Sequence, residues 1–69
     1  MPQEIRTYAV EGMTCDHCRA AVEAEVGAVP GVIRATADPA SGALTVAGVA
    51  IDDRAIAAAV VEAGYEVAP

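Results

Sequence analysis

The chain has 69 residues, of which 55% are hydrophobic and 20% charged, and its formal net charge is −6. This length and composition fit one globular domain of modest stability, because a domain of this size buries only about 60% of the surface that its unfolded chain exposes. The acidic balance and the lack of Lys argue against nucleic-acid binding, which requires a basic surface. With two Tyr and no Phe or Trp, an aliphatic core leaves little room for a deep ligand cavity.

Targeting signals are not evident in the sequence. No segment reaches the roughly 18 consecutive apolar residues of a membrane helix, and the first ten residues lack a basic region followed by an apolar stretch. We therefore expect a cytoplasmic protein without membrane insertion. In that compartment, two Cys separated by two residues indicate metal binding or redox chemistry rather than a resting disulfide. The acidic charge also predicts that a protein partner would offer a basic docking face.

The first half of the chain predicts a strand followed by a helix. Alternating side chains over residues 4–10 are typical of a strand, and a loop over 11–15 follows it. Helical spacing of apolar residues predicts a helix over 16–28, which Pro30 and Gly31 end. The apolar stripe of this helix comprises Cys18, Val22, Val26 and Val29.

The second half predicts a hairpin. Strands over 32–37 and 43–49, the latter with Leu44 and Val46 directed inward, flank a turn over 38–42 that has Pro early and Gly late.

A second helix and a short strand complete the prediction. Asp52 or Asp53 can cap the helix, which extends to about Ala63, with Gly64 at its C′ position. Its apolar face comprises Ile56, Ala59, Val60 and Ala63. Residues 65–67 form the last strand.

The resulting order is β-α-β-β-α-β, and residues 1–69 form a single domain because no linker or repeat interrupts them. Each helix can bury its apolar stripe if both pack on one face of the sheet. We therefore predict the α+β class and a ferredoxin-like sandwich, with a four-stranded antiparallel sheet and two helices on one face.

The segment Gly12–Cys18, of sequence GMTCDHC, carries the chemistry. Cys15 lies in the loop and Cys18 in the first helical turn, where the helix N-terminus lowers a thiol's pKa and offsets negative charge. A structural zinc site needs four Cys or His ligands, and this chain has two Cys and one His. Soft thiolates favour Cu(I), so the pair predicts a site for one Cu(I) ion.

The segment Gly12-Met13-Thr14-Cys15-x-x-Cys18 resembles the signature of the heavy-metal-associated domain family, and His17 before the second Cys resembles its bacterial copper chaperones. The similarity covers nearly the whole chain. It includes Pro30-Gly31-Val32 after the first helix and Ala63-Gly64-Tyr65 after the second. The resemblance implies that Cys15 and Cys18 bind the metal, that Met13 tucks into the core beneath the loop, and that Tyr65 faces the site.

The neighbouring residues refine this reading. Thr14 stands where zinc-preferring relatives often carry Asp, which favours copper, and Tyr65 resembles the residue of the chaperones. His17 is interpreted as a solvated residue of the helix start, with a third ligand or a tuning group for Cys18 as alternatives. For Tyr65, core packing and a contact near the metal are both open. Some relatives place a Lys near the metal, whereas here Arg19 is the only nearby cation in the sequence.

The implied function is a soluble Cu(I) metallochaperone that is not an enzyme. It would bind one ion through two thiolates and transfer it by ligand exchange to a copper-transporting P-type ATPase. A copper-sensing regulator is a second candidate partner, and a metal-bridged homodimer is physically reasonable because a second molecule can supply ligands. The alternatives are a carrier of Zn(II), Cd(II) or Hg(II), and a thiol-disulfide redox protein, although the chain is short for a thioredoxin-like domain and no Pro obviously faces its motif.

Overall fold

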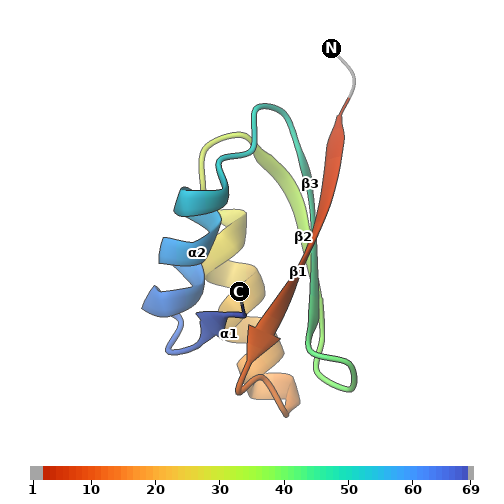
Figure 1. Cartoon of the computed structure of the whole chain (residues 1–69), viewed down its shortest axis with the longest axis vertical. Coiled ribbons are helices and arrows are strands. Elements are labelled where there is room, and N and C mark those ends of the chain that lie inside the picture. Colours follow the sequence, from red (N-terminus) through yellow and green to blue (C-terminus); the bar gives the residue numbers. More distant parts are fainter. Residues whose placement is uncertain (1–2, 69) are drawn as a thin grey trace.

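A computed structural model describes residues 3–68, so residues 1, 2 and 69 of the predicted domain lie outside the described residues. Within that range, two helices and four strands follow one another in the predicted order. They are β1 (Glu4–Glu11), α1 (Asp16–Gly27), β2 (Val32–Asp38), β3 (Ala43–Gly48), α2 (Asp53–Glu62) and β4 (Glu66–Val67). Both helices lie on the same side of the sheet (Figure 1).

The sheet has the strand order β2-β3-β1-β4, and every neighbouring pair is antiparallel. β1 and β3 therefore occupy its centre, and the predicted hairpin is the pair formed by β2 and β3. This arrangement confirms the predicted α+β ferredoxin-like sandwich. One irregularity was not predicted: the register between β2 and β3 shifts at Ile33, which bulges out of the ladder and is 61% exposed.

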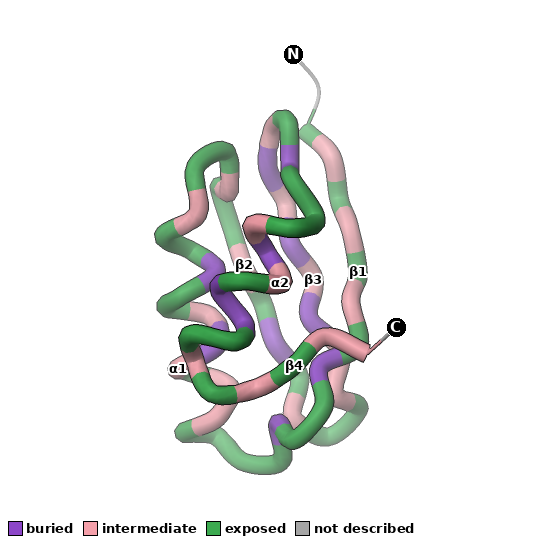
Figure 2. The backbone as a smooth tube through the Cα atoms, turned by 60° about the vertical axis from the view of Figure 1, so that its left-hand side comes forward, coloured by how far each residue is buried: buried purple, intermediate pink, exposed green. Residues whose placement is uncertain are grey.

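The buried residues form one core cluster and lie on both helices and on the strands of the sheet (Figure 2). It is aliphatic, as the composition predicted, apart from one Met. The largest fully buried side chains are Met13, Val22, Val26, Leu44, Val46, Ile56 and Val60. Both predicted helix stripes are confirmed, because Cys18, Val29 and Ala63 pack against this core as partly buried residues.

Element ends differ from the prediction by single residues. β1 and β2 each extend one residue further, whereas β3 ends one residue earlier. α1 ends at Gly27 with Ala28 as its C-cap, because Pro30 disfavours helical backbone in the residue before it. α2 ends at Glu62 with Ala63 as its C-cap. The last strand begins at Glu66, since the N–H of Tyr65 still bonds back to the carbonyl of Val60 in α2.

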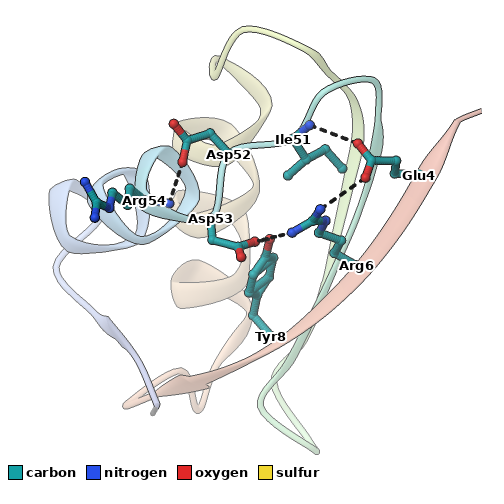
Figure 3. A network of polar contacts seen from close by, with 7 residues as sticks. All are labelled: Glu4, Arg6, Tyr8, Ile51, Asp52, Asp53 and Arg54. Carbon is teal, nitrogen blue, oxygen red and sulfur yellow. Dashed lines mark hydrogen bonds and ion pairs between the residues drawn. The ribbon is translucent and has the colours of Figure 1, made fainter.

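A polar network joins β1 to the start of α2 (Figure 3). The guanidinium of Arg6 lies 3.1 Å from the carboxylate of Glu4 and 2.8 Å from that of Asp53. The hydroxyl of Tyr8 donates to the same Asp53 oxygen at 2.6 Å. Glu4 also accepts from the N–H of Ile51 at 3.2 Å. These contacts fix the second helix to the central strand of the sheet.

Candidate metal centre

The thiol loop, defined here as Gly12–Cys18, connects β1 to the first turn of α1. Met13 anchors it from below, because this side chain is only 2% exposed and belongs to the core. The predicted burial of Met13 is thus confirmed. Gly12 has a positive φ of 85°, a conformation that glycine adopts without steric cost. The chain therefore turns sharply after β1, and beyond the buried Met13 it leaves residues 14–17 exposed.

Cys15 is the N-cap of α1. Its backbone is extended, with φ −146° and ψ 169°, and its sulfur accepts from the N–H of Cys18 at 3.4 Å. A backbone N–H group at the helix start, which has no partner within the helix, thus donates to sulfur. A cysteine here takes the role that Ser, Thr, Asp or Asn usually fills. The cap therefore positions a sulfur atom directly at the positive end of the helix.

The two thiols face each other across the first turn. Their Sγ atoms lie 2.8 Å apart, and both cysteines are free. Cys15 is exposed, whereas Cys18 is partly buried against the core. One thiol is thus fixed by packing, and the other is open to an incoming group.

The surroundings of Cys18 favour its thiolate. Its pKa is lowered to about 7, first by the hydrogen bond with Cys15, then by one from Tyr65 and by the backbone of Thr14. Burial acts in the opposite direction but is weaker. A thiol with this pKa is substantially ionised at neutral pH, which is the form that binds metal ions.

Tyr65 approaches the thiols from the segment between α2 and β4. Its pKa is raised, first by the hydrogen bond with Cys18, then by burial and by the negative charge of both cysteines. The ring also packs over Gly12, where a Cβ atom would lie 3.4 Å from the Cδ1 atom of Tyr65. Tyr65 also packs against the core, as one of the two interpretations has it. A contact near the metal stays a prediction.

The charged neighbours remain at the margin of the site. His17 is exposed, and within residues 3–68 no group of three or more His, Cys, Asp or Glu side chains could hold a metal ion. Arg19 lies 2.9 Å from Glu23 and 3.9 Å from Asp16 along the helix. Its guanidinium is thus engaged with carboxylates. The reading of His17 as a third ligand stays a prediction without geometric support within one molecule.

Glu23 was not singled out by sequence reasoning. One carboxylate oxygen accepts from Arg19, and the other accepts from the backbone N–H of Ala37 at 2.8 Å. Ala37 lies on β2, at the edge of the sheet. Glu23 therefore ties α1, and with it the thiol loop, to that edge.

The donor set fits a soft metal ion of low coordination number. Two sulfur ligands, one exposed and one favoured as thiolate, can hold an ion that accepts few ligands and can admit a further thiolate from outside. A closed structural zinc site would need two more ligands. No described helix has the length and apolar character needed to cross a membrane.

Comparisons with known proteins agree with this geometry. The model of the heavy-metal-associated domain family matches residues 7–66. The copper chaperone CopZ of Bacillus subtilis (strain 168) is 39% identical over 67 residues, which cover 94% of this chain and 97% of CopZ. Copper-transporting ATPase 1 of Rhizobium meliloti (strain 1021) is 44% identical over 64 residues, which cover 91% of this chain but only 8% of that ATPase.

A solved structure supports the same assignment. The structure of a CopZ metallochaperone superposes with a TM-score of 0.83 at 32% sequence identity, covering 97% of this chain and all of that one. The family match begins within β1 and ends at the first residue of β4, so it includes both helices and the thiol loop. By sequence and by fold, this chain belongs to the heavy-metal-associated domain family.

Proposed function

We propose that this protein is a cytoplasmic metal carrier that binds one Cu(I) ion through Cys15 and Cys18. The observation that carries the proposal is the pair of facing thiols, 2.8 Å apart at the start of α1. The similarity to CopZ and to a segment of a copper-transporting ATPase supports copper as the cargo. We assign no catalytic role, and we propose that residues 1–69 act as one heavy-metal-associated domain.

Delivery would proceed by ligand exchange. An acceptor thiolate would add to the ion beside the exposed Cys15, which gives a mixed complex in which both proteins hold the metal. The thiolates of Cys15 and Cys18 would then leave as further acceptor ligands replace them. The proposed receiver is the metal-binding domain or entry site of a copper-transporting P-type ATPase. A copper-sensing regulator with a similar thiolate set is an alternative receiver.

The first test is a competition titration. The reduced protein is titrated with Cu(I) without oxygen, in the presence of a calibrated chromogenic chelator. One ion per chain is expected for the native protein, and strong loss of binding is expected for Cys15→Ser and for Cys18→Ser. His17→Ala is the matched control in the same loop, and it should retain the stoichiometry and most of the affinity.

Two results would contradict the proposal. If both serine variants competed for copper as well as the native protein, the thiol pair would not be the site. If Zn(II) displaced Cu(I) at equal concentration, the cargo would be another metal. Transfer is then followed by NMR, with the copper-loaded carrier mixed with the metal-binding domain of a copper-transporting ATPase. Signals of the thiol loop should return to their metal-free positions.

A further inference from the structure

The sheet face opposite the helices has no covering element among residues 3–68 (Figure 1). The strand register places three threonines, Thr7, Thr45 and Thr36, side by side across β1, β3 and β2. Side chains two residues away along each strand point to the same face. We call this surface the outer sheet face; it comprises the threonine row and one row on either side.

The two flanking rows complement each other. One row consists of Ile5, Ala47 and Arg34, and the other of Ala9, Ala43 and Asp38. On this face, the kinds of side chain follow the same order in both directions along each strand. β1 and β3 each carry an apolar residue, a threonine and a second apolar residue. β2 carries a charged residue, a threonine and a second charged residue. The two charges on β2 have opposite signs. A surface with this symmetry can match a second copy of itself.

The two copies match if a two-fold axis runs parallel to the threonine row, midway between the two facing sheets. Rotation about this axis lays β2 of one copy over β2 of the other in the opposite direction. Arg34 then faces the partner's Asp38, and Asp38 faces the partner's Arg34. Ile5, which is 71% exposed, faces the small side chain of the partner's Ala9. Facing sheets lie about 10 Å apart, a gap that the long arginine side chain can span.

The charge distribution favours this face over others. The chain carries a net charge of −6, so most approaches between two copies bring like charges together. The outer sheet face holds one Arg and one Asp and is neutral. Among the described residues, Arg34 takes part in no ion pair, whereas Arg6 and Arg19 are held by carboxylates. Asp38 accepts from the turn residues Ala40 and Ser41 and retains further lone pairs.

We propose that two copies of this chain associate through the outer sheet face as a two-fold symmetric dimer. The interface is isologous, with the same patch on both copies. Three strands spaced about 4.8 Å apart and five residues long offer only about 250 Å² per copy. Stable interfaces bury about 800 Å² per partner. The dimer is therefore weak and concentration-dependent, and it leaves the thiol loop at the end of the sandwich free.

The experiment uses metal-free protein in the presence of a chelator. Sedimentation equilibrium measures association over a concentration series, and NMR amide shifts report the surface involved. The shifts of Thr7, Thr36 and Thr45 should move with concentration. Arg34→Glu and Asp38→Arg should each weaken association about tenfold or more, because each puts like charges opposite one another. Arg54→Glu makes the same charge change on α2 and should associate as the native protein does.

Mixing the two variants provides the decisive step. A copy with Arg34→Glu and a copy with Asp38→Arg present two attractive pairs to each other, so the mixture should associate although each alone does not. Association of Cys15→Ser should equal that of the native protein, which excludes a metal-bridged dimer. A native protein that remains monomeric throughout, unaffected association of Arg34→Glu, or a mixture without recovery would each overturn the proposal. Circular dichroism verifies that Asp38→Arg, which loses turn contacts, is folded.

Discussion

At the scale of single residues, the site depends on how Tyr65 and Met13 hold two sulfur atoms. Tyr65 donates toward Cys18 and so stabilises its thiolate, while Met13 fixes the loop to the core without reaching the surface. The two side chains therefore have separable effects. Changes at Tyr65 should alter thiol chemistry, and changes at Met13 should alter stability.

Tyr65→Phe removes the hydroxyl but keeps the ring. Because a donor to the Cys18 thiolate is lost, the Cys18 pKa should rise from about 7 toward the ordinary thiol value. The rise should be partial, since the hydrogen bond with Cys15, the larger cause, remains. The rate of Cys18 alkylation at pH 7, followed by mass spectrometry, should fall, and the rates should converge in alkaline buffer.

Tyr8→Phe is the control for this measurement, because Tyr8 bonds to Asp53 outside the thiol loop. Its alkylation profile should match that of the native protein. Equal pH profiles for Tyr65→Phe and the native protein would show that the Tyr65 hydroxyl does not act on the thiolate.

Met13→Leu and Met13→Ala separate packing from metal binding. Truncation of a fully buried side chain to Ala should cost about 2–5 kcal/mol of unfolding free energy. The volume-conserving change to Leu should cost less than about 1.5 kcal/mol. Urea denaturation measures both. Copper affinity should be retained in Met13→Leu; a large loss of affinity in this well-folded variant would instead make the thioether a ligand.

At the scale of elements, a glycine with positive φ turns the chain in the segment that follows each helix. Gly31 has φ 90° and Gly64 has φ 96°. They differ in their surroundings. A Cβ at Gly31 would clash with the backbone oxygen of Val49, whereas a Cβ at Gly64 would meet nothing within 4 Å. Replacement by Ala therefore tests the cost of the positive φ alone at Gly64. At Gly31 it tests the positive φ together with a backbone clash.

Gly64→Ala should cost about 1–2 kcal/mol of unfolding free energy, which is the cost of a left-handed conformation. Gly31→Ala should cost clearly more, because the loop carrying Val49 must also move. Chemical denaturation of both variants gives the comparison. Equal losses of unfolding free energy in the two variants would mean that the backbone at Val49 moves away from Gly31 without cost.

The sequence predicts the apolar stripes of the helices more sharply than it predicts the cap of α2. The stripes containing Val22, Val26, Ile56 and Val60 were predicted, because helical spacing reports burial directly. Asp52 and Asp53 fitted the cap equally well from sequence, and only the hydrogen bond from the N–H of Arg54 selects Asp52. Helix ends were placed within one residue for the same local reasons.

Other features depend on contacts that no local pattern reveals. Glu23 bonds to the N–H of Ala37, fourteen residues away, because α1 happens to cross that edge of the sheet. The bulge at Ile33 and the row of three threonines exist only once the strand register is known. For the site itself, the thiol pair was evident, whereas the role of Cys15 as helix cap required the backbone geometry.

At the scale of the whole molecule, the network around Arg6 couples the sheet to α2 and makes stability depend on pH. The pKa of Glu4 is lowered, first by its hydrogen bond with Arg6 and then by the N–H of Ile51. The pKa of Asp53 is lowered, first by Tyr8 and then by Arg6. Both groups are carboxylates whose charged form is favoured in the folded state.

The sign of the effect follows from proton binding. When the folded pKa lies below the unfolded one, the unfolded state binds more protons over the interval between them. The contribution to stability is then complete above the unfolded values of 4.5 for Glu4 and 3.8 for Asp53. It is lost as the pH falls through the lower, folded values.

Arg6→Gln should therefore flatten the acid limb of the stability curve. Without the guanidinium, the folded pKa of Glu4 moves back toward its unfolded value, and that of Asp53 follows in part because Tyr8 still donates to it. The measurement is the free energy of urea unfolding from neutral pH down to about pH 3. Arg54→Gln removes the same charge from a residue that forms no ion pair within residues 3–68, so its curve should keep the native slope. Parallel curves for Arg6→Gln and Arg54→Gln would mean that the network does not couple pH to folding.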